Sequence, residues 1–235
     1  MKKVILILIL FLSCYFIYNL TIDDRLYYLS LGDFLSSEGS NIYHGYSSQI
    51  KEYLSNENKL KGYNYSFTNN DYRIIDILKV LEYNEKKDNL SLNYLIKKAD
   101  IITISLGMND IYYKLEYNTR KAYLYIDNIL YNYERILSYI NNFPNKKVFI
   151  LGYYNITQKN NDIFDYANYK LKKLCKKYNY VYIDLSNILD NNPMYFNNSS
   201  SFIPNKQGYE KISQIIIEKI KNNWYNILRN FITMT

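Results

Sequence analysis

The chain has 235 residues, 48% of them hydrophobic, and a formal net charge of +7. This length suffices for one full-sized hydrophobic core, so we expect one domain with a short leader rather than several domains. The lysines occur in scattered pairs typical of solvated helix faces, which argues against a nucleic-acid partner and leaves attraction to anionic lipid or cell-wall polymer as the alternative.

Cysteine and histidine are scarce in this sequence. The two cysteines are Cys14 in an apolar leader and Cys175 in a helical pattern, and His44 is the only histidine. Two cysteines so placed do not form a disulfide framework, and one histidine does not make a metal site. We therefore expect no intramolecular disulfide, no metal and no cofactor. The abundance of Asn, Lys, Ile and Tyr runs through the whole chain and indicates a coding bias.

The N-terminus has the pattern of a membrane anchor. Lys2 and Lys3 precede an almost unbroken apolar run over residues 4–20, which as a helix is about 26 Å long, close to the thickness of the hydrocarbon core. No small-x-small cleavage site follows this run. Residues 1–22 are therefore predicted to be a signal-anchor rather than a cleaved signal peptide. The positive flank then stays inside, and the domain at 23–235 lies outside the cytoplasm.

Two other interpretations of this leader compete with the anchor. Residues 11–14 partly match a bacterial lipobox, in which Cys14 would be lipidated after cleavage; the alternative is that Cys14 is a small hydrophobic residue of the anchor. A core element of a soluble protein is disfavoured, because no globular helix needs an apolar surface all round.

Beyond the leader, short apolar runs alternate with segments of helical period, which favours βαβ units. The expected fold class is a three-layer α/β/α domain of the flavodoxin-like kind, with a mostly parallel five-stranded sheet. Strands are predicted at residues 25–31, 63–67, 100–106, 147–151 and 180–184. Helices are predicted at residues 46–54, 72–81, 90–98, 122–142, 162–178 and 208–228. In such sheets ligands bind beyond the carboxyl ends of the strands.

Three short motifs follow predicted strands or open the last predicted helix. Residues 31–39 read LGDFLSSEG, residues 104–110 read ISLGMND, and residues 202–209 read FIPNKQGY. They are similar, in order, to the GDS-x-x-x-x-G, G-x-N-D and D-x-x-H-P-N-x-x-G-Y motifs of the SGNH (GDSL-type) hydrolase family. Each is weak alone, but their order and placement make the resemblance specific over roughly residues 26–225.

This resemblance implies an esterase site whose catalytic groups are missing. Members of the family use a serine nucleophile, a histidine base oriented by an aspartate, and an oxyanion hole formed by the serine amide, a glycine amide and an asparagine side chain. Carried over position by position, the nucleophile falls on Phe34, the acid on Ser200 and the base on Ile203. Asn109 retains the oxyanion-hole amide. The glycine expected near residues 69–71 is absent.

Four further motif residues fall in loops that would bind a ligand, namely Gly32, Asp33, Gly107 and Asp110. A structural role competes with binding at these positions. Asn109 and Asp110 have the residue types that tie neighbouring loops together through side-chain to backbone hydrogen bonds. Asp33 has the residue type that accepts amide hydrogens in a turn, and Gly32 suits a position where a side chain would clash.

A displaced active site is the remaining catalytic alternative. Ser36 and Ser37 would then act as nucleophile, with His44 as the base. Nothing but proximity in sequence supports this pairing, so capping is favoured for the two serines and a loop position for His44.

The leader and the resemblance together predict an exported, membrane-tethered SGNH-fold protein without ester hydrolysis. Its partners would be the membrane, through residues 4–20, and an acylated or acetylated glycan or lipid ligand in a binding or scaffolding role. The alternatives are an active esterase or lipase acting through displaced residues, and a structural envelope protein whose groove is filled by Phe34 and other side chains.

Overall fold

The computed structural model describes residues 23–37, 45–117, 121–157, 159–190, 192–198 and 202–232. The predicted leader, Cys14, His44 and Ser200 lie outside these ranges. No helix within them is both long and apolar enough to cross a membrane.

A five-stranded parallel sheet forms the centre of the molecule, in the order β2-β1-β5-β6-β7. Its strands are β1 (Leu26–Gly32), β2 (Leu60–Asn64), β5 (Ile101–Ser105), β6 (Lys147–Leu151) and β7 (Val181–Ile183). From β1 the chain continues to β2 on one side of β1, and it later adds β5 on the opposite side of β1. The crevice where ligands bind in such folds therefore lies at the carboxyl ends of β1 and β5, which carry the first two motifs.

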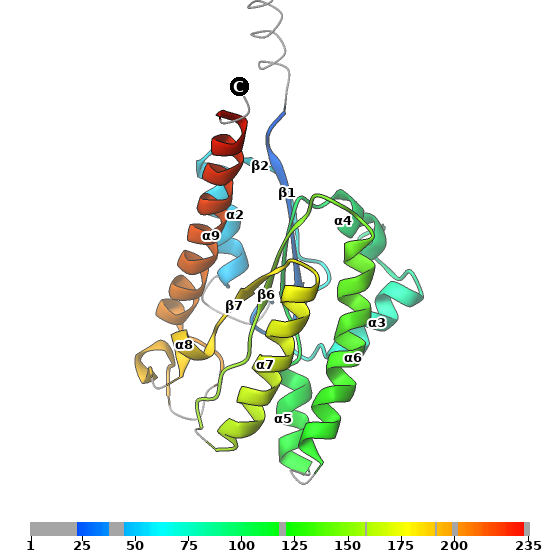
Figure 1. Cartoon of the computed structure of the whole chain (residues 1–235), viewed down its shortest axis with the longest axis vertical. Coiled ribbons are helices and arrows are strands. Elements are labelled where there is room, and N and C mark those ends of the chain that lie inside the picture. The colour runs from blue at the N-terminus through cyan, green and yellow to red at the C-terminus, as the bar shows by residue number, and fades with distance from the viewer. Residues whose placement is uncertain are drawn as a thin grey trace, which may run out of the picture.

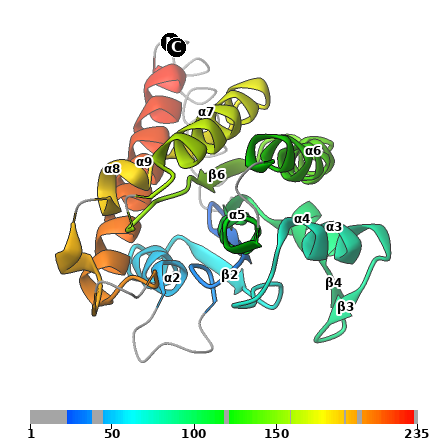
Figure 2. The ribbon, with the colours of Figure 1, turned by 90° about the horizontal axis from the view of Figure 1, so that it is seen from below.

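Helices cover both faces of this sheet, as Figures 1 and 2 show. On one face lie α2 (Tyr46–Asn56) and α9 (Lys206–Ile232), which pack against each other. On the other face lie α3 (Ile74–Glu82), α4 (Leu92–Lys98), α6 (Ala122–Asn141) and α7 (Asn161–Lys177). The predicted three-layer α/β/α architecture with a parallel five-stranded sheet is confirmed.

Alternation along the central strands sets the chemistry of the two faces. Leu29 and Ile102 pair across the β1–β5 ladder and point to one face, where both are fully buried. Ser30 and Thr103 pair next to them and point to the opposite face, which α2 covers. The centre of the sheet is thus aliphatic on one side and lined with hydroxyls on the other.

Several predicted boundaries were wrong. The second strand runs over Leu60–Asn64 instead of 63–67, because α2 ends in a tight motif at Asn58 and the strand begins almost at once. The helix predicted from residue 90 begins at Leu92, because the preceding residues form a hairpin. That hairpin pairs β3 (Lys86–Lys87) with β4 (Leu90–Ser91). Besides this hairpin, three elements were not predicted: α5 (Met108–Tyr117), α8 (Ser186–Leu189) and η1 (Pro193–Tyr195).

Asparagine ends three of the helices where glycine is common. Asn58, Asn84 and Asn179 adopt left-handed φ angles of 54°, 51° and 56°, two residues after α2, α3 and α7 end. After α2, the amide of Asn58 donates to the carbonyl of Ser55 and the amide of Lys59 to that of Leu54. The same paired bonds close α3 and α7, which makes each a Schellman motif. This placement explains part of the asparagine content.

The backbone conformation at the end of β1 requires a glycine at position 32. Its φ is +140°, and a Cβ there would lie 2.0 Å from the carbonyl oxygen of Ser105. Gly32→Ala should therefore lower the free energy of unfolding by about 3 kcal/mol or more. Gly45→Ala is the matched control, since its Cβ would meet nothing closer than 3.5 Å, and a change within about 1 kcal/mol is expected. Urea titration of the full chain in detergent, followed by circular dichroism, measures both; equal stabilities would refute the crowding at Gly32.

Candidate functional site

The first motif loop is held against the end of β5. The amide of Asp33 donates to the carbonyl of Ser105 over 2.8 Å, and the hydroxyl of Ser105 donates back to Asp33 Oδ1 over 2.9 Å. The carbonyl of Gly32 accepts from the amide of Asn69 in the loop after β2. The loop is therefore fixed from both neighbouring strands.

Asp33 is fully buried in this junction. Its Oδ1 also accepts from the amide of Leu35, whereas its Oδ2 has no hydrogen-bond partner among the described residues. Burial raises the pKa of this carboxyl to about 7, against the hydrogen bonds from Ser105 and Leu35, which lower it. The carboxyl thus serves to hold the loop and can keep a proton near neutral pH.

Phe34, at the position predicted for the nucleophile, points into a group of aromatic rings. The side chain is 2% exposed and meets the ring of Phe202 edge-on, with 5.5 Å between centroids. Phe202 in turn lies 5.2 Å from the ring of Tyr112, which lies 5.8 Å from that of Phe164. These four residues form an aromatic column that joins the first loop to α5, α7 and the last loop.

Two buried tyrosines fix the main chain on either side of this contact. Tyr209 Oη, from α9, donates to the carbonyl of Phe34 over 3.4 Å, and Tyr154 Oη donates to the carbonyl of Phe202. Both tyrosine side chains are completely buried, and burial raises the pKa of Tyr154 well above its usual value. The aromatic column is therefore held by its backbone as well as by its rings.

Ser36 lies below the loop and is fully buried. Its Oγ is 3.0 Å from the carbonyl of Leu31 and 2.7 Å from both Tyr46 Oη and Ser105 Oγ. This hydroxyl therefore caps no helix, contrary to the prediction. Tyr46 Oη continues the connection to Thr103 Oγ1 over 3.3 Å, and burial raises the pKa of the Tyr46 phenol. The serine is part of a structural hydroxyl network and is not exposed to substrate.

Asn109 at the start of α5 uses both of its amide hydrogens internally. Its Nδ2 donates to the carbonyl of Asn70 over 2.7 Å and to that of Tyr72 over 2.9 Å. A side-chain amide has two N–H donors, so neither remains for an oxyanion. Beside it, Asp110 Oδ2 accepts from the amide of Ile74 at the start of α3. Burial raises the pKa of the Asp110 carboxyl to about 6.

The last motif is built around the start of α9. Asn205 Oδ1 accepts from the amide of Gly208, which caps the helix, and Asn205 Nδ2 donates to the carbonyl of Met194. Ile203, at the base position, is half-buried and packs against the core. Ser200, at the position of the orienting acid, lies outside the described residues. Where the structure describes it, this motif supplies hydrogen bonds to backbone and apolar contacts but no proton-transfer group.

Two further reactive groups of the described ranges are Cys175 and Asp190. The Cys175 thiol is buried in α7, and burial raises its pKa to about 12, which keeps it protonated. Asp190 accepts from the amide of Asn155 over 2.7 Å, and burial raises its pKa to about 6. Within the described ranges there is neither a histidine nor a cluster of three metal-binding side chains.

Sequence reasoning missed the partners that surround Phe34 and Asp33. Phe202 directly precedes the predicted base position, and its aromatic side chain is the one signal in the sequence for the packing around Phe34. Ser105 stands within the second motif, but nothing in the sequence indicates that its hydroxyl reaches Asp33. Tyr112 and Phe164 come from separate helices, and only the folded structure brings them together.

The fold and the three motif loops at one edge of its sheet define a protein of SGNH-hydrolase architecture. The profile of the GDSL-like lipase/acylhydrolase family matches residues 31–211, and the chain belongs to this family. The resemblance seen in the motifs is thereby confirmed. Comparison with curated proteins gave no match.

Solved structures of esterases and lipases share this fold. The lipase Lip_vut3 from a goat rumen metagenome is 21% identical, with a TM-score of 0.65 over 83% of this chain and 97% of that one. Axe2, an acetylxylan esterase from Geobacillus stearothermophilus, is 13% identical, with a TM-score of 0.64 over 85% and 96%. Two other matched Axe2 structures are catalytic mutants, in which alanine replaces a serine in one and a histidine in the other. At these identities the likeness shows the fold alone.

The buried Asp33 predicts a pH dependence of stability. A carboxyl whose pKa rises from 3.8 to about 7 on folding stabilises the fold below pH 4, and this contribution is lost as the pH rises through about 7. The free energy of unfolding should therefore fall between about pH 4 and 7, with a share from Asp33 on the order of 4 kcal/mol. Asp33→Asn should flatten this decline, whereas the exposed Asp71→Asn should not. Denaturant titrations across that pH range give the slopes, and parallel profiles for all three proteins would rule out the assignment.

Proposed function

We propose that this chain is an exported, membrane-tethered member of its family that does not hydrolyse esters and serves in binding or scaffolding. The observation that carries the proposal is the packing of Phe34 against Phe202, immediately before Ile203. A phenyl ring occupies the position of the nucleophile, and an isoleucine that of the base. Neither side chain has a heteroatom with which to attack a carbonyl or transfer a proton.

The state of the oxyanion hole supports the same proposal. Asn109, the surviving polar member of the site, donates both amide hydrogens to the loop after β2. Stabilising a tetrahedral intermediate requires donors aimed at the developing oxyanion rather than at fixed carbonyls. In this chain the motif residues Asp33, Asn109 and Asp110 bind backbone amides or carbonyls. In this proposal they hold the carboxyl edge of the sheet together and take no part in a reaction.

A displaced nucleophile has little support. Ser36 is fully buried and shares its hydroxyl with Tyr46, Ser105 and the carbonyl of Leu31. Ser37 is 7% exposed, and its amide donates to the carbonyl of Asp33 in the same turn. Active hydrolysis through either serine is therefore the second candidate, and the labelling experiment below discriminates it.

The ligand class in this proposal is an acetylated or acylated glycan. Axe2, whose fold this chain shares, is an acetylxylan esterase, and its substrate class suggests what a related site would recognise. An exported protein that retained recognition and lost cleavage would act as a binding module on such a polymer.

The first test is for hydrolysis. A nucleophile and its base act as a unit, so their joint loss should remove all turnover beyond that of an inert protein in buffer. We expect no release of acetate from aryl acetates or acetylated xylan, and no labelling by serine-directed phosphonates, with an active esterase as the positive control. Phe34→Ser, Ile203→His and Ser200→Asp introduced together should recover weak turnover at most. A single phosphonate-labelled serine in the unmutated chain, located by peptide mapping, would show that the active site has moved.

The second test is for the tether. The apolar run at 4–20 predicts that the full-length protein fractionates with membranes and resists extraction by salt or carbonate. A variant that begins at Thr21 is expected in the soluble fraction. Full-length protein found in the soluble fraction with its leader intact would contradict the anchor, and mass spectrometry of the N-terminus distinguishes that result from cleavage.

A further inference from the structure

The five parallel strands give the molecule two chemically different edges. The strands begin at one edge, where the described chain starts at Asp23, and the motif loops follow their ends at the other. In Figure 1 the chain enters β1 at the top, and α5, which follows β5, lies at the bottom. A strand the length of β1 spans roughly 23 Å, so the two edges are well separated.

Basic side chains gather at the edge where the strands begin, which we call the amino edge. It consists of residues 23–25, 57–61, 97–100, 146–147 and 176–180, which lead into the five strands or begin them. With Lys147 set aside because its Nζ is buried, eight basic side chains lie there: Arg25, Lys59, Lys61, Lys97, Lys98, Lys146, Lys176 and Lys177. Four acidic side chains accompany them: Asp23, Asp24, Glu57 and Asp100. The amino edge is therefore net positive.

The opposite edge, which we call the motif edge, has more acidic than basic side chains. Its described loops, which directly follow the strands, are residues 33–37, 65–73, 106–110, 152–162 without 158, and 184–190. With Asp33 and Asp110 set aside because they are buried, they hold four acidic side chains, Asp71, Asp162, Asp184 and Asp190, and two basic ones, Arg73 and Lys159. A negatively charged surface would attract the amino edge and repel the motif edge.

Part of the positive charge at the amino edge is not neutralised by neighbours. Arg25 and Lys61 pair with Asp23, and Lys59 pairs with Asp24. Lys97, Lys98 and Lys176 are exposed, and no described carboxylate lies within ion-pair distance of them. These three ammonium groups are available to an external anion.

Tyrosines lie beside these lysines. Lys98 Nζ lies 4.1 Å from the centroid of the Tyr27 ring and 5.6 Å from that of Tyr94, which is 48% exposed. Lys177 Nζ lies 5.4 Å from the ring of Tyr178. Lysine and tyrosine together suit the headgroup region of a bilayer, where an ammonium group meets phosphate and a phenol ring spans the polar boundary.

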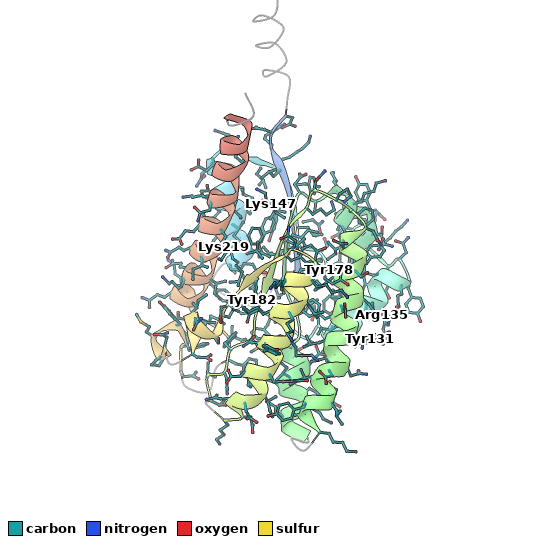
Figure 3. The ribbon with its side chains drawn as sticks, viewed as in Figure 1. Tyr131, Arg135, Lys147, Tyr178, Tyr182 and Lys219 are labelled. Carbon is teal, nitrogen blue, oxygen red and sulfur yellow. The ribbon has the colours of Figure 1, made fainter. Side chains whose placement is uncertain are left out.

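A groove between α7 and β7 extends this surface. Its volume is about 460 Å³, and its lining includes Lys172, Lys173, Lys176, Tyr169, Tyr180 and Tyr182. Figure 3 shows Tyr178 and Tyr182 on this side of the molecule, near the end of α7. The groove shares Lys176 and Tyr180 with the amino edge and has the size of a small-ligand site.

We propose that the amino edge and this groove dock on the headgroups of an anionic bilayer and hold the motif edge away from the membrane. The inference rests on the proposed tether, because the chain that leads from the anchor enters the domain at this edge. The position of Asp23 favours lipid over a cell-wall polymer as the anion, since a short link to a membrane anchor brings this edge next to the bilayer. The motif edge then faces ligands outside the membrane rather than lipid esters within it.

The test uses the full chain in lipid nanodiscs, either zwitterionic or containing about one third anionic lipid. Hydrogen–deuterium exchange should slow at residues 57–61 and 97–100 in the anionic discs only, while residues 69–73 and 152–157 exchange alike in both. Lys97→Glu with Lys176→Glu should abolish the difference. Lys121→Glu with Lys159→Glu, at exposed positions outside the amino edge, changes the charge equally and should leave the difference in exchange intact.

A second measurement is flotation of the Thr21 variant with anionic vesicles. Its binding to the vesicles should weaken roughly tenfold or more with Lys97→Glu and Lys176→Glu, and not with the control pair.

The outcomes separate the docking surface from the tether. Binding of the full chain to zwitterionic discs tests the anchor. If the full chain does not bind these discs, the proposed tether is wrong, but the effect of anionic lipid on exchange at the amino edge can still be measured. Equal exchange in both kinds of disc, or protection of the motif edge instead, would overturn the docking proposal. Protection of the amino edge by soluble polyphosphate, but not by anionic lipid, would also overturn it and indicate an anionic polymer as the partner.

Discussion

The carboxyl edge of this protein depends on one reciprocal pair of hydrogen bonds between Asp33 and Ser105. The backbone amide and the side chain of Asp33 each bond to Ser105, so the first loop cannot shift without breaking both bonds. Gly32 makes the close approach feasible because it brings no Cβ against the carbonyl of Ser105. The orientation of Phe34 follows from this junction. The glycine and the aspartate of the first motif thus shape the backbone at the end of β1.

Beneath the junction, the face of the sheet toward α2 is unusually polar for a buried surface. Tyr28, Tyr46, Ser36, Thr103 and Ser105 connect their hydroxyls into a chain that ends at Asp33. Each buried hydroxyl that lacked a partner would destabilise the fold, so the members of such a network are interdependent. Directional hydrogen bonds between hydroxyls therefore hold this face, whereas non-directional aliphatic packing holds the opposite face.

Much of the fold could be predicted because it follows from periodicity. Apolar runs and helical repeats located five strands and six helices, and the order of the motifs placed two of them at one edge of the sheet. The second strand was placed three residues late because the aromatic residues near Phe67 resemble a strand, whereas Tyr65 to Phe67 form the turn that follows it. The partners of Asn109 and Phe34 could not be predicted, because carbonyl directions and ring contacts between distant segments leave no pattern in sequence.

The aromatic column also determines when the carboxyl edge can form. Phe34 and Phe202 are separated by most of the chain, and the bond from Tyr209 to the carbonyl of Phe34 spans 175 residues. Contacts of such separation require the closure of a long loop and form slowly. A chain that emerges from its N-terminus, whether from a ribosome or a translocon, therefore carries an open first loop until its last helix arrives. Premature termination before α9 would leave the carbonyl of Phe34 without its bond from Tyr209 and would expose the surface of α2 that packs against α9. Exposed apolar surface of this kind is prone to aggregation.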